Sequence, residues 1–412
     1  MAHLGSGEAL GRLCSITTII LLGHRYGVIT VGIYALGLTL CVYLQPVIDF
    51  GLLHVGVRLI ARYPGSASEI VRRVQHRRLL MAGATLPLSL LYACLARLPF
   101  DLKVWLFLFS SIGAMYALSL DWAAWGREHL RTYSLGRALV PFCTLLAVAA
   151  RHHSSGQILW WVMGGYATGF VLQIMAFRLW WARQRPAGAE VVENMEELEE
   201  SLAWRRTSVM GVTWISNMAF HSIDMLMLGV MSNPEQVGLY GAAYRLLNQI
   251  LVTYYLFTNV LYPRLARQTI EDRVRMLHPR YLLSLFGAGV VLAIGLAMVR
   301  HQLLTIFFGH QFLAAAALLF ILSWSLPLDF LTSYLSNAYI AWGMETRVLL
   351  CAAVAAAADI VLNLIWIPVY GATAAAVNTV ISYVVFLTSL ALAGRSAREL
   401  VARAEPQPEV LA

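Results

Sequence analysis

The most informative feature of this sequence is its shortage of charge. Asp, Glu, Lys and Arg make up 13% of the 412 residues, about half of the roughly 25% found in soluble proteins. The AVILMFWYC set makes up 59%. A soluble protein of this length needs more charged residues to cover its surface, so a soluble enzyme and a disordered protein are excluded. A polytopic membrane protein remains.

Motifs for several catalytic chemistries are also missing. The chain has no GxxxxGK[ST] loop for ATP hydrolysis, no acidic DxD cluster for glycosyl transfer and no serine nucleophile elbow. The five cysteines lie in apolar stretches without CxxC spacing, and no histidine has a partner at metal-ligand spacing. We therefore expect no enzyme activity, no cofactor and no metal site.

Long apolar runs predict about twelve membrane spans, because a bilayer core about 30 Å thick needs about 20 apolar residues. No cleavable signal peptide is evident before them. The predicted spans are 8–22, 30–48, 79–96, 104–125, 135–150, 157–178, 207–230, 238–260, 281–299, 312–341, 348–368 and 371–394.

The basic residues predict the orientation of these spans. If the N-terminus is cytoplasmic, 23 Arg residues fall on the cytoplasmic side and 5 Lys or Arg residues on the other. This asymmetry follows the positive-inside rule and puts both termini in the cytoplasm. The net charge of +8 therefore indicates a membrane partner rather than nucleic acid.

One hydrophilic stretch, residues 182–206, divides the chain and carries six glutamates. Apolar residues recur in it near helical spacing, so a short amphipathic helix is predicted. We expect a six-helix lobe over 1–181, a cytoplasmic acidic linker over 182–206, a second six-helix lobe over 207–394 and a cytoplasmic tail over 395–412.

The two predicted lobes repeat each other. At an offset of 206 residues Gly23, Gly32, Tyr34 and Arg58 meet Gly229, Gly238, Tyr240 and Arg264, and at an offset of 217 Ala124-Trp125-Gly126 meets Ala341-Trp342-Gly343. Each unit has an even number of spans, so the two share one orientation in the membrane. Such an architecture places a substrate path between the repeats.

Three stretches carry a resemblance to a known family. They are Ile223–Gly229 with Val237–Tyr240 and Ala242–Leu246, then Asn363–Ala372 running into Ala374–Ala376, and Asp49–Leu52 followed by Arg58 and Arg62. They resemble the polysaccharide biosynthesis (oligosaccharide flippase) family of the multidrug/oligosaccharidyl-lipid/polysaccharide exporter superfamily. The resemblance implies an all-α membrane protein of two six-helix lobes around a central cavity.

The same resemblance implies a function. Members of this family move polyprenyl-diphosphate-linked oligosaccharides from the inner to the outer leaflet of the bacterial inner membrane, for surface polysaccharides such as O-antigen or exopolysaccharide. The implied partners are the lipid-linked substrate, membrane lipids and the polysaccharide polymerase machinery. An ion-coupled drug exporter of the same superfamily is the main alternative. A membrane polymerase or ligase on the same lipid carrier is a second, although the outer loops are short.

Polar residues inside the spans are the site candidates, because a charge at the centre of a span costs about 2.5–3.5 kcal/mol. Asp224 and Arg245 either pair as a structural salt bridge or face the cavity. Arg12 lies inside the first span without a partner nearby in sequence, which favours an anion site, whereas Arg58 and Arg264 either snorkel to lipid phosphates or contact the diphosphate. Asp359 and Asn363 are expected to join neighbouring helices. The substrate candidates are Arg12, Arg58, Arg245, Arg264, Tyr244 and Asn248, and the coupling candidates are His221, Asp224 and Asp329.

Overall fold

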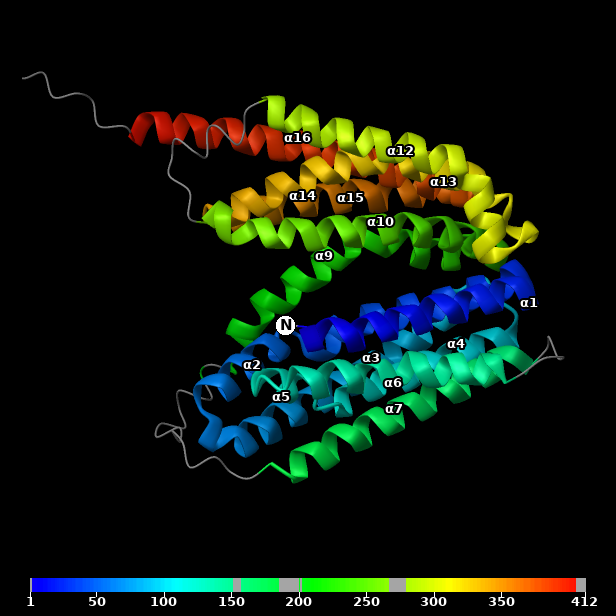
Figure 1. The fold of residues 1–412 in the computed structure, drawn as a ribbon, viewed down its shortest axis with the longest axis vertical. Helices are drawn as coiled ribbons and strands as arrows, with labels where there is room; N and C mark the ends of the chain where they lie inside the picture. Colours follow the sequence, from blue (N-terminus) through cyan, green and yellow to red (C-terminus); the bar gives the residue numbers. More distant parts are fainter. Residues whose placement is uncertain (1, 151–156, 185–199, 201, 267–278, 405–412) are drawn as a thin grey trace, which may run out of the picture. The chain divides into compact units, whose positions relative to one another are not determined.

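A computed structural model describes residues 2–150, 157–184, 200, 202–266 and 279–404 (Figure 1). Every regular element in these ranges is a helix, which confirms the predicted all-α class. Contacts divide the chain into two units. Unit 1 comprises Met1–Met218, Gly229–Gly238 and Ile306–Gln311, and unit 2 comprises Ala219–Leu228, Leu239–Thr305 and Phe312–Ala412.

Each predicted span overlaps the described helices, and two of them, 104–125 and 312–341, are divided among several helices. Unit 1 is built from α1 (Ala2–Asp49), α2 (Leu52–Arg62), η1 (Pro64–Ser66), α3 (Ala67–Leu95), α4 (Phe100–Gly113), η2 (Ala114–Leu118), α5 (Asp121–Gly126), α6 (Leu130–Ala149) and α7 (Ile158–Ala182). The following helices are α9 (Trp204–Met231), α10 (Pro234–Ala266), α12 (Pro279–Phe308), η4 (His310–Phe312), α13 (Ala315–Ser323), α14 (Ser325–Ala341), α15 (Glu345–Tyr370) and α16 (Ala372–Ala404). Most of the predicted acidic linker helix lies outside the described residues.

The first helix accounts for two of the predicted spans. Nine helical stretches among the described residues are long and apolar enough to cross a membrane, and the first, Gly7–Asp49, has 43 residues. At 1.5 Å per residue this is about twice the thickness of the hydrocarbon core. Gly27, with φ 81° and ψ −174°, interrupts the helix. Figure 1 shows the chain leaving the N label and coming back to the same end at α2, so α1 is a hairpin.

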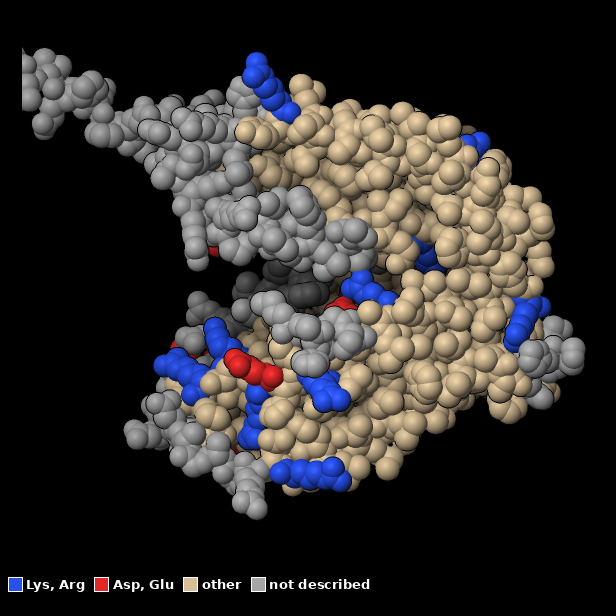
Figure 2. Space-filling view, in the orientation of Figure 1, with Lys and Arg blue, Asp and Glu red and all other residues tan. Residues whose placement is uncertain are grey.

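The short helix α2 is amphipathic and lies at the end of unit 1 that the distribution of basic residues predicts to be cytoplasmic. Its residues Leu52, Val55, Leu59 and Ile60 are buried against α3, α5 and the fully buried ring of Trp122. Arg58 and Arg62 lie on its exposed face. Figure 2 shows basic side chains gathering around this end of the unit.

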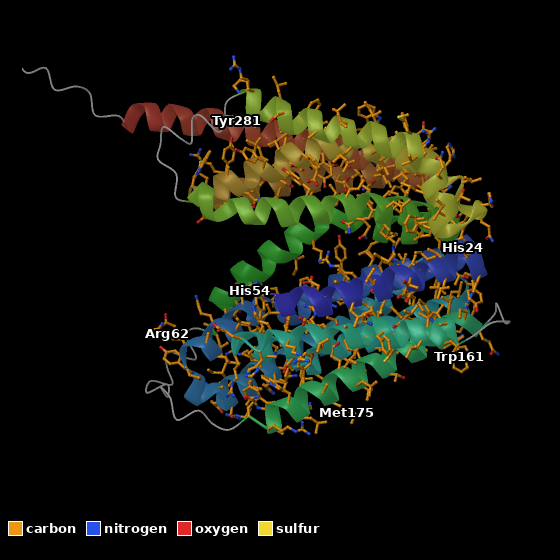
Figure 3. The ribbon with its side chains drawn as sticks, viewed as in Figure 1. His24, His54, Arg62, Trp161, Met175 and Tyr281 are labelled. Carbon is orange, nitrogen blue, oxygen red and sulfur yellow. The ribbon has the colours of Figure 1, made fainter. Side chains whose placement is uncertain are left out.

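The opposite end of unit 1 is marked by aromatic and apolar residues. His24 and Trp161 lie there, whereas His54 and Arg62 lie at the α2 end (Figure 3). A groove of about 910 Å³ runs between α6 and α7 beside Trp160 and Trp161. Large apolar side chains on α7, such as Met175 at 52% exposed, face outward, as expected of a lipid-facing surface.

The core of unit 2 is formed where α14, α15 and α16 pack together. It contains Tyr334, Leu335, Tyr339, Val348, Cys351, Ala355, Phe386 and Leu390. The outer faces of these helices are apolar as well, with Leu364 55% and Val354 54% exposed. Helices that are apolar on both faces suit burial in a bilayer.

Candidate functional site

Unit 2 contains a buried cluster of polar side chains drawn from four helices, which we call the Asp224 cluster. Its members are Asp224 on α9, Tyr240 on α10, Asp359 and Asn363 on α15, and Asn378, Thr379 and Ser382 on α16. Each is at most 9% exposed. Buried polar groups in a membrane are costly unless they bond to each other, and these do.

Two helix turns bring the cluster together. Gly371, with φ 57°, ends α15 and lets α16 begin at once, since glycine adopts positive φ without a steric cost. Asn363 lies eight residues before Gly371 and Thr379 eight after it, so the two meet at one level. Similarly, α10 begins at Pro234, where the Asn233 side chain accepts a hydrogen bond from the Gln236 N–H at 2.9 Å.

Asp224 accepts hydrogen bonds on both carboxylate oxygens. The Tyr240 hydroxyl donates to Oδ2 at 2.7 Å, and the Asn363 side-chain amide donates to Oδ1 at 2.5 Å. The Thr379 hydroxyl lies 2.8 Å from Oδ2 and also 2.8 Å from the Ala375 carbonyl oxygen. A hydroxyl has one hydrogen, so Thr379 donates to one of these acceptors at a time.

Asn363 links the two carboxyl groups. Its amide nitrogen also donates to Asp359 Oδ2 at 3.2 Å, and its oxygen accepts a bond from Asn378 at 2.9 Å. Ser382 donates to Asp359 Oδ1 at 2.8 Å. The buried side-chain oxygen of Asn378 accepts no hydrogen bond from the described residues.

The cluster is short of positive charge. Its two carboxyl groups are bonded to hydroxyls and amides, and the described ion pairs all lie elsewhere. Two buried carboxylates that share one amide repel each other unless a counter-charge or a proton neutralises one of them. Carboxylate oxygen atoms are also the ligands that hard cations prefer.

Unit 1 contains a second buried polar cluster, centred on Arg78 of α3. Its Nε lies 2.9 Å from Asp49 Oδ1, and the Tyr116 hydroxyl donates to Asp49 Oδ2 at 2.9 Å. The Arg78 guanidinium donates to the carbonyl oxygens of Ser119 and Tyr116 at 2.9 and 3.3 Å and stacks over the Tyr116 ring. The predicted orientation counts Arg78 among the 23 cytoplasmic arginines, but its side chain is fully buried.

The structure bears on two expectations about arginine. Asp224 has Tyr240, Thr379 and Asn363 as its described hydrogen-bond partners, and the pairing with Arg245 that the sequence left open stays a prediction. Arg12 does have a partner nearby in sequence, because its Nη2 lies 3.0 Å from Glu8 Oε1, one helical turn earlier. Both side chains of that pair are about half exposed.

The other candidates fall in several places. Tyr244 stacks on Tyr240 with ring centroids 6.0 Å apart, and Asn248 and Arg245 are half-buried on the same helix. Asp329 is buried and accepts a bond from Ser333 at 3.0 Å within α14, apart from the Asp224 cluster. Arg58 is exposed on α2. The side chains of His221 and Arg264 lie outside the described residues.

Sequence reasoning missed the contribution of α16. Asn378, Thr379 and Ser382 are polar residues in an Ala-rich apolar helix. Thr379 lies as far after Gly371 as Asn363 lies before it, and the separations of Ser382 and Asp359 from Gly371 differ by one residue. Tyr240 was noted as a repeat match and as part of the family resemblance, but not as a site candidate. The equal spacing about the two helix turns was the signal available in the sequence.

Comparison with known proteins agrees with this architecture. The chain is similar to the lipid II flippase MurJ in an inward closed conformation, with 13% identity, 96% of this chain and 88% of that chain covered, and a TM-score of 0.72. It is also similar to an inward-facing multidrug resistance MATE family transporter of the MOP superfamily, with 11% identity, 97% of this chain and 96% of that chain covered, and a TM-score of 0.74. The eukaryotic MATE transporter AtDTX14 is similar as well, with 13% identity, 97% of each chain covered and a TM-score of 0.56. The chain therefore shares the fold of these solved structures.

A family model agrees with the resemblance. The polysaccharide biosynthesis protein family matches residues 133–268, a segment that contains Asp224, Tyr240 and Arg245. The resemblance predicted from the sequence is confirmed for this part of the chain. A search of curated protein sequences finds no match.

Proposed function

We propose that the chain is a flippase that moves polyprenyl-diphosphate-linked oligosaccharide across the bacterial inner membrane for surface polysaccharide synthesis, with both termini cytoplasmic. The observation that carries this proposal is a fold shared with MurJ over 96% of the chain, together with the family match over residues 133–268. The protein then acts as a transporter and not as an enzyme, and works with polymerase machinery that consumes the moved lipid.

The Asp224 cluster supplies the coupling step in this proposal. One carboxyl of the pair carries a proton, or the pair holds a cation, and release of that charge leaves two carboxylates that repel each other. Four helices meet at the cluster, so a change of charge there alters the packing of α9 and α10 against α15 and α16. His221 and Asp329 remain further coupling candidates.

The substrate contacts are assigned to the stretch of α10 beside the cluster. Tyr240 donates to Asp224 and stacks on Tyr244, so a change at Asp224 reaches the side chains one turn further on. Asn248 and Arg245 extend this stretch, and an arginine fork suits diphosphate oxygens. Arg12, Arg58 and Arg264 are further candidates for the diphosphate.

Surface polysaccharide in a flippase-deficient host, normalised to membrane-inserted protein, tests the function. The wild-type chain should restore polysaccharide, Arg245→Ala should abolish it and Arg245→Lys should restore part of it, because lysine keeps the charge but not the fork. The double variant Arg245→Ala with Asp224→Ala should stay inactive. Full recovery in that double variant would reassign Arg245 to a structural role.

An ion-coupled drug exporter is the second candidate, favoured by the TM-score of 0.74 to a multidrug resistance MATE family transporter. The two functions differ in what the protein moves. Drug resistance conferred on a sensitive host, without restored polysaccharide, would select the exporter.

A further inference from the structure

The ends of α5 and α7 and the start of α6 carry a cluster of basic and aromatic residues, which we call the α5–α7 patch. It consists of Arg127, Arg131, Arg183, Trp180, Trp181 and Gln184. The three apolar helical stretches of this region end at Gly126, begin at Leu130 and end at Ala182. The patch therefore lies at the level where the spans leave the hydrocarbon, on the side that the distribution of basic residues predicts to be cytoplasmic.

Arg127 is held in place but incompletely bonded. Its guanidinium carbon lies 4.6 Å from the centroid of the Trp181 ring, a cation–π contact that fixes the plane of the fork. Nη1 reaches Gln184 Oε1 at 3.5 Å, a long hydrogen bond. Its Nε is buried and has no acceptor among the described residues. Partial burial lowers the pKa of this guanidinium below its ordinary value, although an arginine stays charged.

The charges around Arg127 are mostly of one sign. Arg131 and Arg183 are exposed, and the described ion pairs do not include either of them or Arg127. The acidic residues near Arg127 in sequence are Asp121, which is buried, and Glu128, which is exposed. A guanidinium fixed on Trp181, with one long hydrogen bond from its Nη1 and with two further arginines in the patch, suits a bidentate anionic acceptor.

We propose that the α5–α7 patch binds the phosphate of an anionic phospholipid from the adjoining leaflet, with Arg127 as the central donor. A phospholipid satisfies both parts of the patch. Its phosphate accepts hydrogen bonds from Arg127, while its acyl chains cover the tryptophan rings and Leu179, which is 55% exposed. A free phosphate ion would leave those apolar groups uncovered, and tryptophan rings at this depth are typical of headgroup contact.

Thermal unfolding of the full-length protein in a neutral detergent, titrated with phosphatidylglycerol or phosphatidylcholine, tests the proposal. Phosphatidylglycerol should raise the melting temperature of the wild type, and phosphatidylcholine should not. Arg127→Gln should raise the apparent Kd for phosphatidylglycerol about fivefold, the loss expected for one arginine at an anionic membrane surface. Arg127→Lys should fall between the two, because it keeps the charge without the fork.

Arg72→Gln is the matched control. Arg72 is an arginine of the same unit, exposed and already paired with Glu69, so its removal should leave the lipid response unchanged. An unaltered response in Arg127→Gln would overturn the proposal. An equal loss of melting temperature of Arg127→Gln in both lipids would also overturn it, because that result indicates a structural role. So would inorganic phosphate that raises the melting temperature of the wild type as much as phosphatidylglycerol does.

The acidic linker that follows Gln184 in sequence is the competing occupant. If the linker fills the patch, phosphatidylglycerol should leave the melting temperature of the wild type unchanged. It should then strongly raise the melting temperature of a variant whose six linker glutamates are changed to glutamine. That pair of results would also overturn the proposal. A wild type that responds, with no further gain in the glutamine variant, supports it. None of these outcomes depends on which substrate the chain transports.

Discussion

The two buried polar clusters of this protein balance their charge in opposite ways. In unit 1 the carboxylate of Asp49 meets the guanidinium of Arg78 at 2.9 Å. In unit 2 the carboxyl groups of Asp224 and Asp359 share the amide of Asn363, and their other described partners are neutral. A paired charge holds its helices in one arrangement, whereas an unbalanced pair of carboxyl groups needs a proton or a cation to neutralise it. The first cluster is therefore suited to a structural role, and the second to binding and releasing a proton or a cation.

The repeat shows that the second cluster belongs to one half alone. At the offset of 206 residues Tyr240 corresponds to Tyr34, but Asp224 corresponds to Thr18. At the offset of 217 residues the counterparts of Asp359, Asn363 and Thr379 are Phe142, Leu146 and Val162. The two halves thus share a scaffold of glycine and aromatic residues while only the second carries the acidic pair.

The largest expected effect comes from breaking the paired cluster. Arg78→Gln should leave Asp49 as an uncompensated buried charge and destabilise the protein by about 3–5 kcal/mol. We expect a severe loss of membrane-inserted protein, measured by fluorescence-detected size exclusion. Arg72→Gln removes an exposed, paired arginine and should leave the abundance close to that of the wild type, because surface ion pairs contribute little to stability. Equal abundance of these two variants would contradict the structural role of Arg78.

Neutralising the acidic pair should separate activity from stability. Asp224→Asn and Asp359→Asn keep the shape of the side chain and lower the negative charge, so we expect near-normal abundance with transport lost and its dependence on the ion gradient removed. The measurement is surface polysaccharide per inserted protein at several external pH values. Asp329→Asn tests the third acidic candidate in the same assay. Unchanged transport in both cluster variants would remove this site from the mechanism.

A smaller effect should distinguish the two tyrosines that donate to these carboxylates. Tyr116→Phe removes one bond to Asp49, and Tyr240→Phe removes one bond to Asp224, each worth about 1.5–3 kcal/mol for a charged acceptor. Because Thr379 and Asn363 still donate to Asp224, Tyr240→Phe should lower stability less than Tyr116→Phe and transport more. Melting temperature and polysaccharide output, measured together, check this ordering. Identical profiles for the two variants would count against the division of roles.

The smallest expected effect is that of topology reporters, which should leave function intact and only report location. Fusions after Gly188 and Ala404 should report cytoplasm, and fusions at Asn233 and His301 should report periplasm, as the distribution of basic residues predicts. A periplasmic signal at Gly188 would contradict the comparison of the two halves, because the two repeats would no longer share an orientation in the membrane.

Much of the fold could be predicted from the sequence, because the length of an apolar run indicates a span and matched residues at a constant offset indicate the repeat. All twelve predicted spans overlap described helices, and Asp224 was recognised as a buried acid. The partners of Asp224 could not be predicted from charge alone, because Arg245 is the nearest opposite charge on the next helix whereas the described donors are neutral side chains from α10, α15 and α16. Pairing across 139 and 155 residues depends on which helices pack together. Arg78 was missed for a similar reason, since its partner Asp49 comes from another helix.

The turn of the chain at Gly27 also indicates how deep other residues lie in the membrane. Backbone groups at a turn need water or headgroups, so Gly27 marks one surface of the bilayer. From there each arm of the hairpin runs about 20 residues, or about 30 Å, to Gly7 and to Asp49, which is the thickness of the hydrocarbon core. Asp49 and its bond to Arg78 therefore lie at the opposite surface. Asp224 lies seven residues from the end of α9 at Met231, about 10 Å along its helix, well within the hydrocarbon layer.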